Sequence, residues 1–300
     1  MLKRTITGGI ILLVTVAFVL LKMVSPLFMD AFILLISIAS LYEMINAYKL
    51  IDKIPNKVAL YAVPVLMCVS YIFAPTVLMA FALNCLIAVA LLMFLLSNDI
   101  ADLARQRKLG TTEQNVSVLN QSLFEKTRVS MLIYAYPLLP ISFMFGINHL
   151  PYEIGYIGII LVFVIAMLTD TCAYLFGRAF GKKKFVPEVS PNKTVEGVVG
   201  GFIGGIIGSL ACYFIFFNTN IFSVLNVAGQ GVSITAFLII AIIGSFINQL
   251  GDLIASAFKR KINLKDYGKI FPGHGGFMDR YDGTMFVAVL VYLVLVVFFV

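Results

Sequence analysis

The sequence contains few charged residues. Only 12% of its 300 residues are Asp, Glu, Lys or Arg, while 61% are hydrophobic and the mean hydropathy is +1.00. Soluble globular domains carry about a quarter charged residues. The composition therefore excludes an ordinary soluble domain and indicates an integral membrane protein.

Cysteine and histidine are also scarce, with four and two residues respectively. All four cysteines lie inside apolar runs and no two form a CxxC pair, which favours neither a disulfide framework nor a zinc site. We interpret them as small, buried apolar side chains. They are Cys68, Cys85, Cys172 and Cys212.

Long apolar runs, by contrast, are abundant. A helix that crosses a bilayer needs about 20 apolar residues, and nine runs are candidates. We therefore predict an all-α integral membrane protein with about nine transmembrane helices. Residues 1–128 form an N-terminal helical region, and residues 129–300 form a C-terminal region that carries most of the polar clusters. The candidate runs are residues 6–26, 29–48, 58–74, 76–97, 129–148, 153–177, 197–217, 233–255 and 283–300.

The first run follows Lys3 and Arg4, as the core of a signal peptide would. Its apolar length exceeds the roughly 7–15 residues typical of such a core, and no small-residue cleavage site stands out. We interpret it as a retained helix.

Lysine and arginine concentrate in alternate connections between the runs. The connections near residue 75, at 149–152 and at 218–232 contain neither residue. The positive-inside rule then places the N-terminus and every polar cluster in the cytoplasm, on a multi-pass protein of the cell inner membrane. Lys22 breaks the pattern, and we expect its ammonium to extend to the membrane interface. The net charge of +7 suits anionic lipid headgroups and phosphorylated substrates, and we expect no nucleic-acid partner.

The first polar cluster ends the apolar run at 153–177. Asp170, Tyr174 and Arg178 are spaced by four residues and so share one face of the predicted helix. A carboxylate inside a spanning helix is costly and usually functional or paired. We therefore predict a functional role for Asp170.

The second cluster precedes the run at 197–217. Ser190 or Asn192 is expected to cap this helix, with Pro191 near its first turn. A helix N-terminus beside Lys193, Thr194 and Glu196 also suits a phosphate, so the segment is either a cap with an ordinary basic loop or a cap that also binds phosphate.

The third cluster begins on the run at 233–255. A polar stripe with spacings of three and four residues indicates one helix face, and it consists of Ser245, Asn248, Asp252, Ser256 and Lys259. A loop then leads to Asp279, Arg280 and Asp282. Carboxylates without His or Cys partners favour a hard cation such as Mg²⁺.

The loop between these residues contains His274 among three glycines. We expect Gly273, Gly275 and Gly276 to allow positive φ angles and close approach of a ligand. His274 is a general base, a hydrogen-bond donor to phosphate or a turn residue, and we favour the last two.

Two features lie outside these clusters. In the run at 197–217, Gly197, Gly201 and Gly205 form one ladder, and a second ladder is offset by three residues, which predicts close helix packing. Glu43 lies inside an apolar run, where it pairs with another helix or faces a cavity, and the sequence assigns it no role in the site.

These residues resemble the phosphatidate cytidylyltransferases, also called CDP-diacylglycerol synthases, of the bacterial type. The resemblance covers roughly residues 155–285 well. Its C-terminal signature is matched by Ser256, Phe258, Lys259, Arg260, Lys265, Asp266, Gly268, Phe271, Pro272, His274, Gly275, Gly276, Phe277, Asp279, Arg280 and Asp282. Tyr281 stands where an aliphatic residue is usual. Upstream, Asp170 to Gly181, Ser190 to Gly197 and Gly251 to Leu253 follow in the family's order.

The resemblance implies that CTP and phosphatidate give CDP-diacylglycerol and pyrophosphate. It implies a Mg²⁺ ion held by Asp252 and Asp279, a potassium ion beside it, and a homodimer. The residues expected to be catalytic are Asp252, Asp279, Lys259, Arg260, His274 and Arg280. Those expected to bind substrate are Asp170, Arg178, Ser190, Lys193, Thr194, Glu196, Ser256, Lys265, Asp266, Gly275, Gly276 and Asp282.

Two other classes compete with this hypothesis. A polyprenol kinase or a CDP-archaeol synthase would share membrane helices and phosphate-binding clusters, but the complete signature argues against both. A transporter would use Asp170 and Asp252 for a coupling ion. The polar residues crowd one face and no inverted repeat is visible, which disfavours that class.

Overall fold

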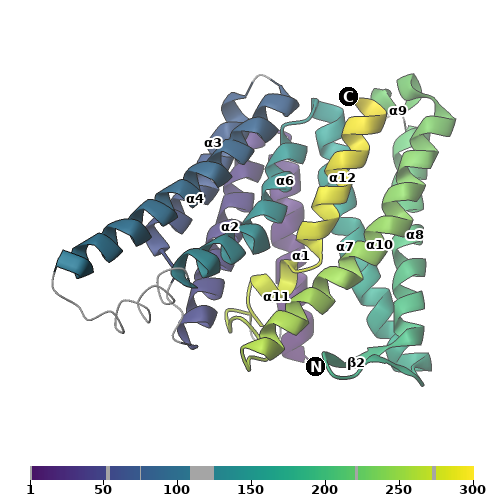
Figure 1. Ribbon diagram of the computed structural model, residues 1–300. Helices are drawn as coiled ribbons and strands as arrows, with labels where there is room; N and C mark the ends of the chain where they lie inside the picture. The colour runs from purple at the N-terminus through teal and green to yellow at the C-terminus, as the bar shows by residue number, and fades with distance from the viewer. Residues whose placement is uncertain (1, 52–54, 75, 109–124, 220–221, 272–274) are drawn as a thin grey trace.

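The computed structural model is a helical bundle, and it describes all residues except 1, 52–54, 75, 109–124, 220–221 and 272–274 (Figure 1). Residues 125–133 are also helical and lead into the π-helix η1 (Tyr134–Leu138). The remaining helices are α1 (Leu2–Leu21), α2 (Pro26–Lys49), α3 (Lys57–Phe73), α4 (Val77–Lys108), α6 (Leu139–Asn148), α7 (Tyr152–Phe180), α8 (Val195–Thr219), α9 (Ser223–Ala228), α10 (Gln230–Lys261), α11 (Met278–Tyr281) and α12 (Thr284–Phe299).

Six helices in the described part of the chain are long and apolar enough to cross a membrane. They cover Pro26–Lys49, Met79–Asp102, Glu125–Asn148, Glu153–Phe180, Val195–Thr219 and Gln230–Lys261. The other three predicted runs form shorter apolar helices, Thr7–Leu21, Lys57–Phe73 and Thr284–Phe299. The prediction of an all-α membrane protein is confirmed, and the number of nine spans stays a prediction.

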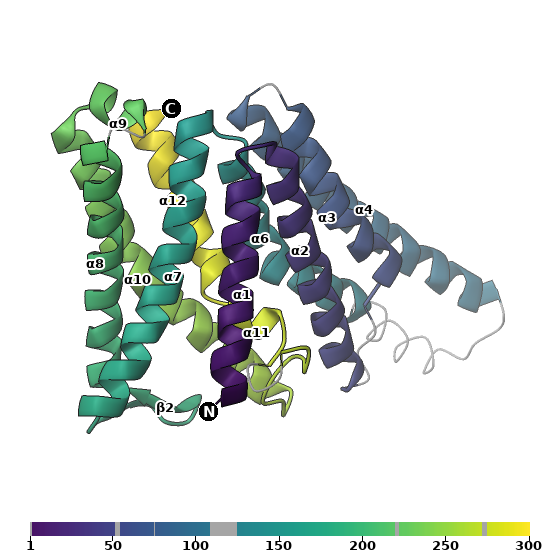
Figure 2. The ribbon, with the colours of Figure 1, turned by 180° about the vertical axis from the view of Figure 1, so that it is seen from behind.

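The helices share one apolar core. It extends from Met29 on α2 to Leu295 on α12, and α2 packs against η1, α6 and α11. The N-terminal region therefore contacts the region that carries the polar clusters. The N-terminus of α1, strand β2 and the C-terminal end of α10 lie at one end of the bundle, while the C-terminus lies at the other (Figures 1 and 2).

The glycine ladders of α8 pack as predicted. A Cβ atom at Gly204 would lie 2.5 Å from the carbonyl oxygen of Leu168 on α7, and one at Gly201 would lie 3.0 Å from Gln249 Nε2 on α10. The two ladders thus allow α8 to approach two neighbouring helices at once, because glycine leaves no side chain between the backbones. This packing holds α7 and α10, which carry two of the polar clusters, close together.

A short hairpin precedes α8 and corrects one prediction. Strand β1 (Lys184–Val186) pairs antiparallel with β2 (Ser190–Thr194), and α8 begins at Val195. Neither Ser190 nor Asn192 caps the helix, because both belong to β2. Instead Thr194 Oγ1 accepts a hydrogen bond from Gly197 N at 3.1 Å, which is the usual N-cap interaction.

One further prediction, about Lys22, was wrong. Lys22 does not extend to the interface, because it is 2% exposed and its Nζ donates to the carbonyl and side-chain oxygens of Asn148 at 2.9 and 2.6 Å. Helix α4 continues past its apolar run to Lys108.

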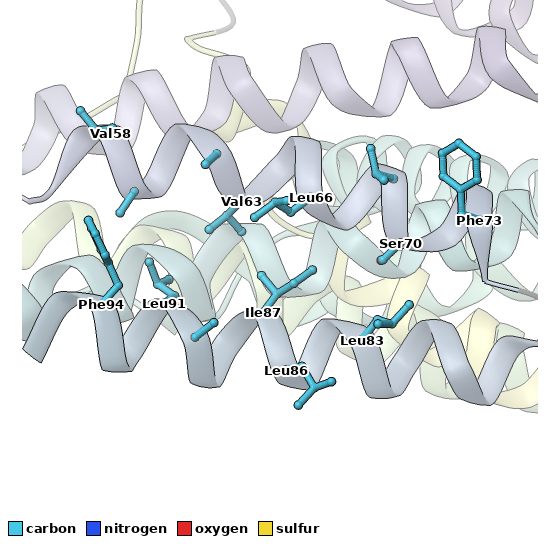
Figure 3. Close-up of a pocket in the computed structure, with 14 residues that line it drawn as sticks. Val58, Val63, Leu66, Ser70, Phe73, Leu83, Leu86, Ile87, Leu91 and Phe94 are labelled. Carbon is cyan, nitrogen blue, oxygen red and sulfur yellow. The ribbon is translucent and has the colours of Figure 1, made fainter. Parts of the chain in front are cut away.

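An apolar groove of about 670 Å³ runs between α3 and α4. In Figure 3 the labelled side chains of Val63, Leu66 and Phe73 on α3 lie across from those of Leu83 and Ile87 on α4. None of the residues that line it belongs to the predicted site. The groove therefore does not enter the site.

Candidate functional site

The polar stripe on α10 forms the centre of the site. Asn248 is fully buried, Ser256 and Lys259 are each 9% exposed, and Asp252 is only partly covered. The spacing of three and four residues aligns these side chains along one face of α10, as predicted. Each of Asn248, Asp252 and Lys259 contacts a different neighbouring element.

The first contact, at the end of the stripe nearest the N-terminus of α10, joins α10 to α7. Asn248 Nδ2 donates to Asp170 Oδ1 at 2.7 Å, and Thr169 Oγ1 donates to Ser245 Oγ at 3.2 Å. Asp170 therefore lies at the stripe. Further along α7, Arg178 is exposed and its guanidinium donates to the hydroxyl of Tyr174 at 3.5 Å.

The second contact joins α10 to strand β2. Lys193 Nζ lies 2.8 Å from Asp252 Oδ2 and donates to the Gln249 carbonyl at 3.2 Å. Ser256 Oγ lies 3.4 Å from the other oxygen of Asp252. The hairpin thus brings a lysine to the stripe. Glu196, in the first turn of α8, accepts weak hydrogen bonds from the backbone N–H of Lys183 and, among the described residues, does not contact the stripe through a hydrogen bond.

The third contact joins α10 to α11. Lys259 Nζ lies 2.7 Å from Asp279 Oδ1, and both side chains are almost completely buried. Asp279 Oδ2 accepts from the backbone N–H groups of Tyr267 at 2.8 Å and Gly276 at 2.9 Å. Asp279 therefore fixes both ends of the loop that precedes α11.

The glycine prediction for this loop is confirmed at one position. Gly275 has a φ of +80°, and its carbonyl accepts from Phe271 N at 2.9 Å. This backbone conformation is rarely adopted by residues with a side chain. Gly273 and His274 lie outside the described residues, so both keep only their predicted roles.

Asp282 follows α11 and lies close to the other carboxylates. It is 7% exposed and accepts from Gly283 N at 2.8 Å. Burial raises the pKa of its carboxyl group well above the usual value, and the neighbouring charge of Asp252 raises it further. Lys259 and Arg280 partly offset this effect.

The remaining predicted residues surround the buried stripe on the exposed side. Arg260 is exposed and its guanidinium donates to the carbonyls of Val189 and Leu264 at 3.4 and 3.3 Å. Lys265, Asp266 and Arg280 are exposed as well, and Ser190 is partly covered. The site thus has one buried charge pair, Lys259 with Asp279, one partly exposed pair, Lys193 with Asp252, and a rim of accessible cations.

The sequence missed Glu43 as a member of this site. Its carboxylate comes from α2, is 2% exposed, and accepts from Phe277 N at 3.0 Å and Met278 N at 2.9 Å. The one available signal was the cost of placing a carboxylate inside an apolar helix. That signal does not indicate the partner, which lies 234 residues further along the chain.

The oxygen donors of the site suit a hard cation. In the described residues no three His, Cys, Asp or Glu side chains lie close enough to hold a metal ion together. Asn248 Oδ1, however, is buried and has no hydrogen-bond partner there. A Mg²⁺ ion is usually bound by one or two carboxylates together with water and substrate phosphates, so carboxylates of this kind fit such an ion.

Comparison of the sequence with known proteins identifies the family of the chain. Residues 2–298 match the model of the cytidylyltransferase family. A phosphatidate cytidylyltransferase of Staphylococcus aureus (strain COL) is 40% identical over 184 residues, which are 60% of this chain and 65% of the relative. Matches to proteins of the same name from Staphylococcus haemolyticus and Staphylococcus saprophyticus, at 34% and 36% identity, each cover 70% of this chain and 77% of the relative. The chain matches slightly less than two thirds of the length of the S. aureus protein. By its sequence over almost its whole length, the chain belongs to the cytidylyltransferase family.

Proposed function

We propose that this protein is a phosphatidate cytidylyltransferase, which converts CTP and phosphatidate to CDP-diacylglycerol and pyrophosphate. The observation that carries the proposal is the convergence of β2, α7 and α11 on one stripe of α10, with Lys193 paired to Asp252 and Lys259 paired to Asp279. The names of the staphylococcal relatives support the choice of substrates.

The reaction is an in-line attack of the lipid phosphate on the α-phosphorus of CTP. A phosphate monoester is already largely deprotonated at neutral pH, since its second pKa is about 6. The enzyme therefore needs no strong general base. Catalysis depends on positioning and on neutralising negative charge, as in other phosphoryl transfers. The accessible cations Arg178, Arg260, Lys265 and Arg280 share that charge with Lys193 and Lys259.

Asp252 and Asp279 would hold the Mg²⁺ ion, which when bound supplies positive charge at the triphosphate. Each carboxylate is paired with a lysine ammonium, at 2.8 Å in one case and 2.7 Å in the other. A lysine that gives up its carboxylate partner remains within reach of the same place and can bind a phosphate oxygen. Lys193 and Lys259 therefore hold the two carboxylates in place without substrate and bind phosphate with it. A potassium ion and a homodimer are further parts of the proposal, taken from the family resemblance.

The lipid chains have a path to this site along α2. An apolar groove of about 780 Å³ is lined on α2 by residues from Ala31 to Tyr42, and it also contacts Ile270 and Phe277. Phe277 directly precedes α11, so the groove reaches the start of the helix that carries Asp279. We place an acyl chain of phosphatidate in this groove, with its headgroup at the loop.

The site faces the cytoplasm in this proposal, within a multi-pass protein of the inner membrane. The N-terminus, the hairpin and the end of α10 lie at one end of the bundle, and this end carries the Lys- and Arg-rich segments (Figures 1 and 2). Retention of positive segments in the cytoplasm favours this orientation. CTP then reaches the site from water, and phosphatidate reaches it from the bilayer.

The test uses purified protein in detergent with phosphatidate, Mg²⁺ and CTP labelled at the α-phosphate. We expect label in the lipid fraction, loss of transfer with EDTA, and recovery with added Mg²⁺. Transfer that persists in EDTA would refute the metal assignment alone. Transfer of a γ-labelled phosphate to a lipid alcohol, with no transfer of the α-label, would refute the cytidylyltransferase and favour the kinase.

A further inference from the structure

Glu43 links the N-terminal region to the start of α11, the helix that carries Asp279. The two oxygens of its carboxylate accept from consecutive backbone N–H groups, those of Phe277 at 3.0 Å and Met278 at 2.9 Å. Glu43 is 2% exposed and lies on α2, which also packs against α11. Hydrogen bonds from backbone N–H groups to a carboxylate are among the stronger ones in proteins.

The loop is shaped around this carboxylate. A Cβ atom at Gly276 or at Gly268 would collide with a carboxylate oxygen of Glu43. Both glycines therefore allow the backbone to approach the carboxylate more closely than any other residue could. The loop contacts Glu43 from two positions eight residues apart in the sequence, which fixes its fold as well as its place.

Three consecutive backbone N–H groups are bound by two carboxylates. Gly276 N donates to Asp279 Oδ2, and the next two N–H groups donate to Glu43. The other oxygen of Asp279 holds Lys259 on α10. A continuous chain of charged hydrogen bonds thus runs from α2 through the start of α11 to the stripe on α10.

The cost of burying a carboxylate in α2 indicates a functional role for the Glu43 contact. A carboxylate inside a membrane helix is costly and is usually functional or paired. Ser40, three residues earlier on α2, is fully buried and its hydroxyl has no hydrogen-bond partner in the described residues. Ser40 is therefore a suitable control for Glu43, because it is a buried polar side chain on the same helix that makes no hydrogen bond to the described part of the loop.

We propose that Glu43 is a positioning residue, which sets the place of Asp279 and Arg280 by binding the backbone at the start of α11. The kinetic part of this inference rests on the proposed function, and the structural part does not. Small displacements of charged groups are enough to reduce turnover, because a shift of about 1 Å in a catalytic site can cost on the order of 100-fold.

The experiment compares Glu43→Gln with Ser40→Ala in detergent. Glutamine keeps the size of the side chain but removes the charge and places an amide N–H₂ against one of the two backbone donors. We expect faster hydrogen–deuterium exchange confined to peptides within 268–283, a fall in melting temperature of only a few degrees, and a fall in kcat of about tenfold or more. The KM for CTP should change by less than about twofold, since the cations Arg178 on α7 and Lys193 on β2 lie on elements that Glu43 does not hold. Ser40→Ala should alter none of these quantities.

A second variant makes the result independent of the charge change. Gly268→Ala keeps Glu43 but pushes a methyl group against its carboxylate, and we expect the same local rise in exchange. Unchanged exchange in both variants would overturn the proposal, and so would faster exchange spread over the whole chain with a lower melting temperature, which would show a purely structural role. If the unmodified protein transfers no label from CTP, the proposed function fails, while the exchange data still decide whether Glu43 positions the loop.

Discussion

Replacing Asp252 with asparagine separates the stability of the site from its chemistry. The substitution keeps the shape of the side chain and removes one negative charge next to Lys193 Nζ, which lies 2.8 Å away. The two side chains are 37% and 21% exposed, so the ion pair is partly solvated. Such pairs contribute about 0.2–1 kcal/mol to stability. We therefore expect the melting temperature to fall by at most roughly 4 °C.

The effect on turnover should be much larger. Removing one preorganised electrostatic group from an active site typically lowers kcat by about 10²–10³. Transfer of α-labelled CTP to lipid measures the turnover. The protein has no tryptophan, but Cys68 and Cys212 are buried, so a thiol-reactive dye can follow unfolding. Glu188→Gln, an exposed acid in the turn between β1 and β2, serves as the control and should leave both quantities unchanged.

Two results would contradict this reasoning. Full activity in Asp252→Asn would show that its charge takes no part in the reaction, which would sink the metal assignment. A loss of activity accompanied by a fall in melting temperature of more than about 10 °C would show that the residue mainly supports the fold.

Two further predictions concern the helices around the site. Gly204→Ala places a methyl group against the Leu168 carbonyl, and overpacking of this kind costs about 1–3 kcal/mol, so the melting temperature should fall clearly. Gly231→Ala, where nothing lies within 4 Å, should not lower it, and equal melting temperatures for the two variants would contradict the packing argument. Ile38→Trp should fill the groove that ends at Phe277 and raise the KM for phosphatidate several-fold while the KM for CTP stays constant. Equal changes in both KM values would show that the groove does not hold the lipid.

Properties that depend on short stretches of sequence could be predicted. The spanning helices follow from the length of the apolar runs, because each helix satisfies its own backbone hydrogen bonds and needs no distant partner. The stripe from Ser245 to Lys259 follows from the period of the helix in the same way. The motif spacings also sufficed to indicate the family before any geometry was known.

Local spacing gave no information on which distant groups meet. Asn192 was a plausible helix cap by composition, yet pairing between β1 and β2 placed it in a strand and left the cap to Thr194. Lys22 looked like an interfacial side chain, yet Asn148 on another helix binds it inside the protein.

The sequence by itself therefore determined a helical membrane protein with three polar clusters and a cytidylyltransferase signature. The tertiary structure decided that α10 joins these clusters, and that Glu43 from the N-terminal region holds the start of α11, the helix of Asp279. The physical reason is that helix formation is governed by neighbours within a few residues. Contact between the Glu43 side chain and a backbone N–H group 234 residues away depends instead on how the whole bundle packs.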